Sequence, residues 1–307
     1  TVLTFDPSDG YDGAGHPQHT TDGLGVVRRM TYDALGRLTT KTDDVGGTDP
    51  GTANAQTAFA YDALDHLQGI SDPSGLDTVY DTNAFGDALG NQSPDSGSTT
   101  IATDAAGNPL IRTDARGVTV TSTYDALNRV TSESYPDATL DVSYYYDEAD
   151  AVTGCSDDYP IGRLTRIVEA DGVATTYCYD RAGRVLRKTL TVAGATTTTQ
   201  YGYTLAGRLS SMTYPSGAVL AYTRDGDGRI SAATLTPAGG GAAQSLVSAV
   251  AYAPFGAVAS YQLGSGQTVT RAFDANGRIS AVSSAVLGLA YSRDVEGNVT
   301  GVSGIST

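Results

Sequence analysis

The chain has 307 residues, a net charge of −15, 37 glycines, 19 tyrosines, five phenylalanines and no tryptophan. This acidity argues against nucleic-acid binding, which needs a basic stripe to neutralise phosphates. No run approaches the 18 consecutive apolar residues of a membrane span, whereas an apolar fraction of 40% is adequate for a folded protein.

The first 31 residues are rich in Asp, Gly and Thr and contain His16 and His19. Two histidines three residues apart can bind a metal, but no Cys or third His stands near them, and Pro17 argues against a helix that presents both. We therefore predict a surface loop here and no metal site.

The first clear motif is Tyr32-Asp33-Ala34-Leu35-Gly36-Arg37-Leu38. Its Asp can accept backbone N–H groups within a turn, and a Gly three residues later tolerates the positive φ that closes the turn. Arg37 lies four residues beyond Asp33, where it can fold back and pair with it, although exposed pairs of this kind contribute only about 0–1 kcal/mol. The motif predicts a joint in which an aromatic residue ends one strand and an aliphatic residue opens the next.

The same motif recurs along the whole chain, with Gly or Asn at its fourth turn position. From residue 163 onward the arginine-like position returns about every 21 residues, and a period in this range indicates a repeat architecture. The residues predicted to form the structural joints are Tyr32, Asp33, Gly36, Arg37, Tyr124, Asp125, Arg129, Tyr179, Asp180, Gly183, Arg184, Gly207, Arg208, Gly228, Arg229, Asp274, Gly277 and Arg278.

The segments between joints predict the rest of a hairpin meander. Residues 43–54 predict a long polar loop at a hairpin tip, and a similar loop is expected at 90–98. Between residues 100 and 131 the joints are about ten residues apart, so both turns of a hairpin are built from the same motif there. Thr139–Tyr146 alternates strictly and predicts a half-buried strand, with tyrosine rows stacking from one repeat to the next. Residues 236–244 predict another hairpin loop.

Two cysteines accompany a break in the rhythm at residues 147–160. Cys155 lies in this insertion, and Cys178 lies in a strand that we expect to pair with 163–169 through a turn at Asp171-Gly172. A Cys155–Cys178 disulfide would close a loop of 22 intervening residues and contribute about 3 kcal/mol. The alternative is a pair of unpaired buried thiols. A disulfide would indicate an oxidising compartment.

No catalytic constellation can be picked out from the sequence. The four glutamates, at 133, 148, 169 and 296, occur in contexts typical of exposed residues, and nearly every Asp already serves a turn. Asp225-Gly226-Asp227-Gly228 resembles the opening of a calcium loop but lacks the downstream ligands. Tyr rings beside Arg-Asp pairs also suit a sugar-binding groove, but sheet packing explains them more simply. We therefore predict no enzyme activity, cofactor or metal.

The motifs Tyr-Asp-x-x-Gly-Arg-Leu, Tyr135-Pro136-Asp137 and Tyr214-Pro215-Ser216-Gly217 resemble the YD repeats of the RHS family. That family includes bacterial Rhs polymorphic toxins, shell-forming components of insecticidal Tc toxins, wall-associated proteins and animal teneurins. Ile161-Gly162-Arg163-Leu164-Thr165 and Tyr177-Cys178-Tyr179-Asp180 particularly resemble proteobacterial Rhs proteins. The resemblance implies an all-β fold, an antiparallel hairpin meander whose sheet spirals into a hollow shell or a rod. We recognise neither the family's C-terminal self-cleavage core nor an effector domain in these residues.

The resulting expectation is a single repeat array over residues 1–307, interrupted at 147–160 and cut from a longer secreted or surface-exposed bacterial protein. Its function would be structural, in a shell that encloses a toxin effector, with the rest of the parent chain and that effector as partners. The alternative is an extracellular fibre or adhesive module that self-associates through sheet edges or binds glycans.

Overall fold

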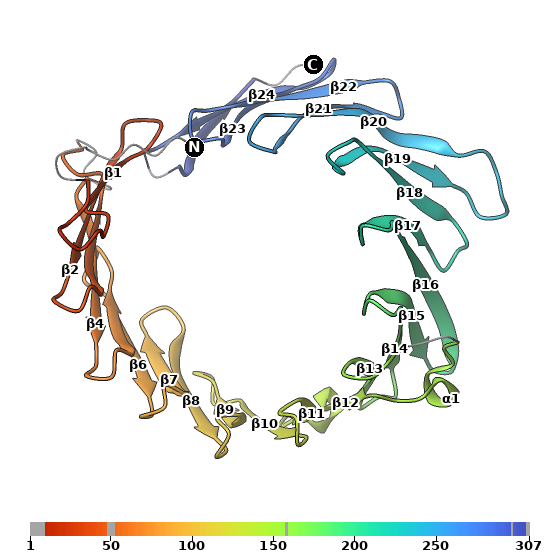
Figure 1. The fold of residues 1–307 in the computed structure, drawn as a ribbon, viewed down its shortest axis with the longest axis horizontal. Coiled ribbons are helices and arrows are strands. Elements are labelled where there is room, and N and C mark those ends of the chain that lie inside the picture. Colours follow the sequence, from red (N-terminus) through yellow and green to blue (C-terminus); the bar gives the residue numbers. More distant parts are fainter. Residues whose placement is uncertain (1–9, 48–52, 157–158, 296, 305–307) are drawn as a thin grey trace. The chain divides into compact units, whose positions relative to one another are not determined.

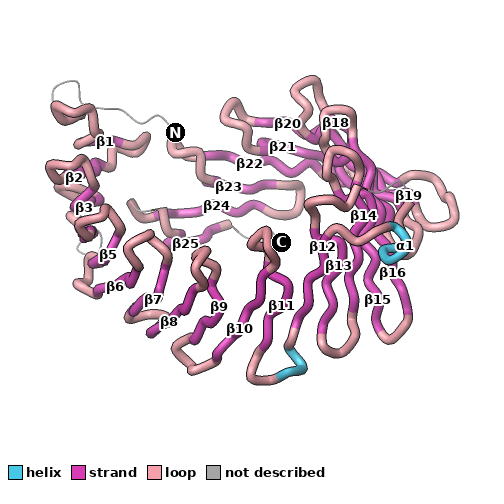
Figure 2. The backbone as a smooth tube through the Cα atoms, turned by 60° about the horizontal axis from the view of Figure 1, so that its bottom comes forward, coloured by secondary structure: helices cyan, strands magenta, loops and turns pink. Residues whose placement is uncertain are grey.

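The structure, a computed structural model, describes residues 10–47, 53–156, 159–295 and 297–304. Within these ranges 25 strands belong to one sheet, and the strand pairs with a defined register are antiparallel (Figure 1). The predicted all-β hairpin meander is confirmed. In the described residues two short helical segments occur, the 3-10 helix η1 (Ala138–Leu140) and the helix α1 (Asp150–Thr153), and both stand out from the strands in Figure 2.

The chain divides into two compact units, which we describe separately. Unit 1 comprises residues 1–100, 252–260 and 267–307, and unit 2 comprises residues 101–251 and 261–266. The strands that lie wholly in unit 1 are β1 (His19–Thr21), β2 (Val27–Tyr32), β3 (Leu38–Asp43), β4 (Ala55–Tyr61), β5 (Leu67–Ser71), β6 (Asp77–Thr82), β7 (Ala88–Ser93), β22 (Thr268–Phe273), β23 (Ile279–Ser283), β24 (Gly288–Arg293) and β25 (Val299–Ser303).

Unit 2 holds the middle of the chain. Its strands are β9 (Pro109–Thr113), β10 (Thr119–Tyr124), β11 (Val130–Ser134), β12 (Val142–Tyr146), β13 (Leu164–Glu169), β14 (Ala174–Tyr179), β15 (Val185–Val192), β16 (Ala195–Tyr203), β17 (Leu209–Thr213), β18 (Val219–Arg224) and β19 (Ile230–Thr236). Three strands contain a boundary between units: β8 (Gly97–Thr103), β20 (Gln244–Tyr252) and β21 (Val258–Leu263).

Successive strands alternate between two sets of turns. We call the turns that follow even-numbered strands A-edge turns, and those that follow odd-numbered strands B-edge turns. The strand before an A-edge turn typically ends in a register shift, as between Cys178 and Tyr179, where Tyr179 pairs with Val185. Such a bulge increases the local twist and re-aims the terminal side chain. The bulge therefore orients the residue that starts the joint, which is Tyr179 in this case.

The sheet has few fully buried side chains. Among the described residues the buried apolar side chains are Val26, Cys155, Cys178, Tyr179 and Val269, whereas most strand residues are half-buried. Thr is frequent in many strands, because β-branched residues suit a pleated, half-buried surface. Contacts between neighbouring turns therefore matter more here than in a protein with a thick apolar core.

Two predictions about strands were wrong. Residues 90–98 do not form a long loop. Strand β7 continues to Ser93, strand β8 begins at Gly97, and the two strands pair with each other. The strand predicted at Thr139–Tyr146 begins only at Val142. Asp137 accepts a hydrogen bond from the Thr139 backbone N–H, and this cap starts η1 instead of a strand.

Other predicted connections agree with the structure. The hairpins β3–β4 and β19–β20 bracket the expected loops, although Asp49-Pro50-Gly51 lies outside the described residues. Strands β13 and β14 pair through the predicted turn, where Gly172 has φ 83°. The turns at Asp104, Asp114 and Asp125 use the same hydrogen bonds, as expected from their ten-residue spacing.

Candidate functional site

The feature that recurs throughout the chain is the Asp-centred turn, and the turn at Asp180 shows its geometry. The Asp180 backbone N–H donates to the Arg184 carbonyl (2.9 Å), and the Gly183 N–H donates back to the Asp180 carbonyl (2.9 Å). Asp180 Oδ1 accepts the backbone N–H groups of Ala182 and Arg184, both at 2.9 Å. Gly183 has φ 83°, a conformation that an L side chain rarely adopts.

The second carboxylate oxygen binds the arginine four residues later. Arg184 Nε donates to Asp180 Oδ2 at 2.6 Å. Equivalent Nε–Oδ2 bonds of 2.7, 2.7, 2.9 and 2.8 Å are made by the pairs Arg37–Asp33, Arg129–Asp125, Arg229–Asp225 and Arg278–Asp274. In these turns both carboxylate oxygens of the Asp therefore accept hydrogen bonds within the same turn, as at Asp180.

Variant turns keep this pattern with other residues. His66 and Asn108 replace the arginine and bind Asp62 and Asp104 through side-chain nitrogens at 3.0 and 2.9 Å. In the Asn83 turn the donor and the acceptor exchange places: the first residue donates through Asn83 Nδ2 and Asp87 Oδ2 accepts, at 2.7 Å. Asn128 occupies the glycine position with φ 60°. The local geometry thus depends on donor and acceptor placement and not on one residue type.

The carboxylates of these turns have lowered pKa values. The guanidinium of Arg184 holds the pKa of Asp180 below its usual value, and the backbone N–H of Arg37 does the same for Asp33. Burial acts to raise the pKa of Asp225, but the Arg229 backbone N–H and guanidinium together lower it. These carboxylates are therefore ionised near neutral pH and accept hydrogen bonds within their own turns.

The arginine also reaches the next A-edge turn. Arg37 Nη1 donates to the Asp62 carbonyl (3.1 Å), Arg184 Nη1 to the Thr204 carbonyl (3.3 Å) and Arg208 Nη1 to the Asp227 carbonyl (3.2 Å). Where Asn108 replaces the arginine, its Nδ2 donates to Asn128 Oδ1 at 2.9 Å. We call this chain of contacts the turn ladder, since each turn is bonded to its neighbour.

Tyrosines supply a second link between neighbouring turns. The Tyr61 hydroxyl donates to the Leu38 carbonyl (3.0 Å), Tyr146 to Val130 (2.9 Å) and Tyr203 to Val185 (2.9 Å). The guanidinium of the preceding turn lies over the same ring, 4.9 Å from it for Arg37 on Tyr61, 4.3 Å for Arg129 on Tyr146 and 4.7 Å for Arg184 on Tyr203. Arginine thus lies between successive turns, where direct tyrosine stacking was predicted.

Two turns begin with Arg instead of Tyr, and the sequence analysis did not assign these residues a role. Arg224 Nη2 donates to the Leu209 carbonyl (2.7 Å) and Arg293 Nη2 to the Ile279 carbonyl (3.0 Å), the bonds that tyrosine hydroxyls make elsewhere. Their Nη1 atoms bind the carbonyls of Gly228 and Gly297. The signal was present in the sequence, because each Arg stands directly before the Asp of a turn.

The positive φ is one reason for glycine in these turns, and the turn ladder gives a second reason at certain positions. A Cβ atom at Gly183 would lie 2.8 Å from Arg163 Nη2, and the Arg208 guanidinium occupies the corresponding space at Gly228. Gly207 is less crowded, with Arg184 Nη1 3.6 Å away, and Gly277 faces the ring of Phe255 at 3.7 Å. The preceding turn therefore restricts the next one sterically as well as by hydrogen bonds.

The insertion at 147–160 is fastened to the sheet at two points. Cys155 and Cys178 form the predicted disulfide, with their Cα atoms 5.7 Å apart, and both are buried. Arg187 Nη2 donates to the Gly154 carbonyl, and Arg187 Nε lies 3.2 Å from Cys178 Sγ. Helix α1 therefore rests against β14 and β15 of unit 2.

Glu148 does not have the exposed position that the sequence predicted. Its carboxylate accepts hydrogen bonds from Arg166 Nη2 (2.5 Å) and from the buried hydroxyl of Thr165 (3.1 Å). Nearby, burial and a hydrogen bond to Glu133 raise the pKa of Tyr144 to about 12. Both glutamates therefore accept hydrogen bonds from side chains of neighbouring strands.

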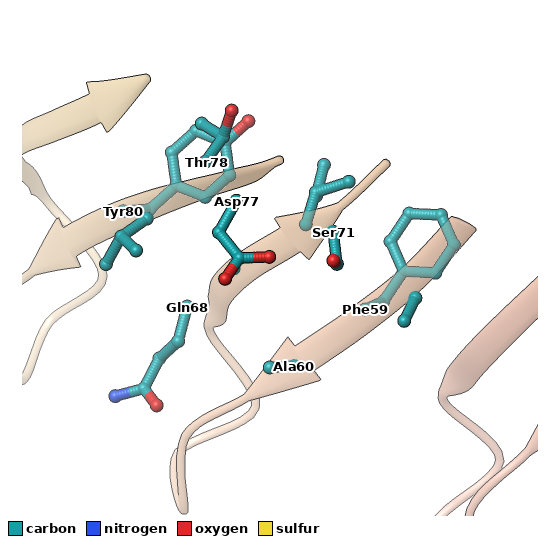
Figure 3. Close-up of a pocket in the computed structure, with 11 residues that line it drawn as sticks. Phe59, Ala60, Gln68, Ser71, Asp77, Thr78 and Tyr80 are labelled. Carbon is teal, nitrogen blue, oxygen red and sulfur yellow. The ribbon is translucent and has the colours of Figure 1, made fainter. Parts of the chain in front are cut away.

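A hollow with a volume of about 470 Å³ lies on three strands of unit 1, β4, β5 and β6 (Figure 3). The register places Ala58, Ser71 and Asp77 side by side, followed by Ala60, Gly69 and Val79. These small side chains leave the hollow open, and Asp77 is the single carboxylate among its lining residues.

The two histidines considered as metal ligands are hydrogen-bonded to other side chains. His16 Nδ1 lies 2.8 Å from Asp12 Oδ2, and His19 Nε2 accepts a bond from Arg29 Nε at 2.7 Å. Among the residues that the structure describes, no three His, Cys, Asp or Glu side chains gather as metal ligands. In those same ranges, no helix has the length and apolarity to cross a membrane.

Sequence comparison identifies the repeat. The RHS repeat family matches residues 11–49, 104–140, 160–197, 179–219 and 203–242, which together cover just over half of the chain. This chain belongs to the RHS repeat family. A search of curated proteins gave no significant match.

Solved structures share the fold. The crystal structure of TcdB2-TccC3-Cdc42 aligns with 96% of this chain at 18% identity and a TM-score of 0.71, and that of TcdB2-TccC3 gives the same values. The structure of the Photorhabdus luminescens Tc holotoxin pore aligns with 96% at 17% identity and a TM-score of 0.69. The chain spans 18% of the length of each of these matched chains.

Proposed function

We propose that this RHS chain is a non-enzymatic wall segment of a larger protein, in which the repeat sheet encloses and shields a toxin effector. The turn ladder is the observation that carries the proposal. In each complete turn the Asp, Arg and Tyr side chains bind the same or the neighbouring turn, as at Asp180, Arg184 and Tyr203. Such side chains build a continuous sheet and are not available to a substrate.

The arrangement suits a wall because it stabilises the sheet without a thick core. A thick apolar core would need a second layer, whereas the ladder lets half-buried strands stand side by side. The fold shared with TcdB2-TccC3 supports the same role. The effector and the remainder of the parent chain are the partners in this proposal.

We place the protein outside the bacterial cytoplasm, secreted or at the cell surface. The Cys155–Cys178 bond supports this location, since disulfides form and persist mainly in oxidising environments. We also propose that residues 1–307 form one repeat array with 147–160 as an insertion, because Asp-centred turns recur in both units.

Cryo-electron microscopy of the full-length parent protein tests the proposal. A closed wall of RHS sheet with density for an enclosed domain is the expected result. An open rod or a polymer of many copies would contradict enclosure and would support an extracellular fibre. A turnover reaction that is abolished by a single alanine substitution in residues 10–304 would contradict the non-enzymatic assignment.

A further inference from the structure

One contact in unit 1 joins turns that are far apart in the sequence. Asn276 Oδ1 accepts the backbone N–H of Gly23 (3.0 Å), and Asn276 Nδ2 donates to Asp22 Oδ2 (3.0 Å). Asp22 begins the B-edge turn between β1 and β2, and Asn276 lies at the tip of the A-edge turn between β22 and β23. We infer that the Asp22-Gly23 turn and Asn276 form a specific docking site that selects which hairpins of the sheet lie edge to edge.

The Asp22 turn is prepared to receive an external donor. Asp22 Oδ1 accepts the N–H groups of Leu24 (2.9 Å) and Val26 (3.1 Å), as in the other Asp-centred turns. The residue four positions after Asp22 is Val26, which offers no side-chain donor for Oδ2. The side chain of Asp22 is only 5% exposed, and Arg28 Nη1 is 3.4 Å from Oδ2. Asn276 therefore completes the hydrogen bonding of a buried carboxylate, which is costly to leave unsatisfied.

Gly23 makes the close approach possible. A Cβ atom at this position would lie 2.8 Å from the carbonyl oxygen of Ala275, so a side chain here would push the two turns apart. Among the described B-edge turns that begin with Asp, the next residue is glycine only here. The corresponding residues in the other three turns are Val45, Pro73 and Ala115.

The tip residue is equally distinctive. The backbone N–H of Asn276 donates to Asp274 Oδ1 (2.9 Å), which holds the tip in a fixed direction. Among the described A-edge turns of the same length, only this tip carries an amide side chain. The residues at the equivalent tips are Leu35, Leu64, Phe85, Ala106, Leu127, Ala182, Ala206, Asp227 and Phe255. Among the described turns, an Asp-Gly pair at the start of a B-edge turn and an Asn at an A-edge tip thus occur once each. Their contact sets the lateral register of the hairpins within unit 1.

A charge-exchange experiment tests this docking site. Asn276→Asp brings a second carboxylate to Asp22 and is expected to raise the hydrogen-exchange rate of the Gly23 amide roughly tenfold or more, because its acceptor moves away. The double variant Asp22→Asn with Asn276→Asp restores a donor facing an acceptor and is expected to recover protection. The Asn83–Asp87 turn of this chain already uses that reversed pair.

Matched controls separate docking from general destabilisation. Ala182→Asp places an extra carboxylate at another tip and is expected to leave exchange at residues 19–32 unchanged. Gly23→Ala is expected to increase exchange in both 19–32 and 268–283, whereas Gly226→Ala, also directly after a turn Asp but with open space around it, is not. Far-UV circular dichroism confirms that each variant remains folded. Gly23 protection that is unchanged in Asn276→Asp, or not recovered in the double variant, would overturn the inference.

Discussion

The turns that start at Asp180 and Asp225 use similar backbone hydrogen bonds but begin with different side chains. Tyr179 is buried and donates through its hydroxyl to the Leu164 carbonyl at 2.5 Å. Arg224 donates through Nη2 to the Leu209 carbonyl at 2.7 Å, and its Nε is buried without a partner. These two turns therefore place a long donor against one carbonyl in two chemical ways, with a tyrosine hydroxyl or with an arginine guanidinium.

The largest expected effect concerns the disulfide, which stands beside the Asp180 turn. Cys155→Ala with Cys178→Ala is expected to lower the free energy of unfolding of unit 2 by about 3 kcal/mol, because the loop of 22 intervening residues is no longer closed. Urea denaturation, followed by hydrogen exchange in residues 164–192, measures this. Exchange at 219–236 in the native state serves as the control. A loss as large at 219–236 as at 164–192 would show that the bond does not act locally.

The next largest loss of stability is expected from the replacement of a turn glycine by alanine. Gly228→Ala is expected to destabilise by about 2–3 kcal/mol, since it combines a strained positive φ with a clash against Arg208. Gly117→Ala has nearly the same φ, 77° against 76°, but open space around it, and is expected to cost only about 1 kcal/mol. Thermal denaturation compares the two variants. Equal losses would mean that the ladder does not restrict the turn.

Removing one hydroxyl tests the tyrosine link. Tyr179→Phe keeps the ring but loses the donor to the Leu164 carbonyl, and we expect a loss of about 1 kcal/mol. Chemical denaturation monitored by circular dichroism measures it.

The reciprocal control is Arg224→Tyr. This change replaces one donor to the Leu209 carbonyl by another and removes the buried Nε, but it also loses the Nη1 bond to the Gly228 carbonyl, so the expected loss is at most about 1 kcal/mol. A loss above that of Tyr179→Phe would show that the two turns are not equivalent.

The smallest effect for a single turn concerns pH. Asp180 and Asp225 have folded-state pKa values below their ordinary values, so each contributes stability that is present above about pH 4 and is lost as the pH falls through the lowered pKa. Hydrogen exchange at these turns is expected to increase as the pH falls below 4. The Thr204 turn has a hydroxyl in place of this carboxylate and provides the control. After correction for intrinsic exchange rates, an identical acid response at all three turns would contradict the assignment.

The sequence predicted the fold class and the backbone of the turns because Asp and Gly act within five residues. It also predicted the pairing of β13 with β14 and the cysteine bond, since a short turn fixes strand register. It failed at Thr139–Tyr146, where alternation favoured a strand but the Asp137 cap started a 3-10 helix. It could not reveal the links between turns, such as Tyr203 to Val185, because these span about 20 residues and depend on how the strands pair. Nor could it bring Asn276 to Asp22, which are 254 residues apart.

The turn ladder has a consequence for how such proteins change in length. Each A-edge turn bonds mainly with the one before and the one after it, so the energetic effect of a defect or an added hairpin remains near its place of origin. Gain or loss of whole hairpins then preserves the remaining contacts, provided that the new turn offers an acceptor carbonyl and a glycine. A family built in this way can alter its size by duplication or deletion without redesigning a shared interior.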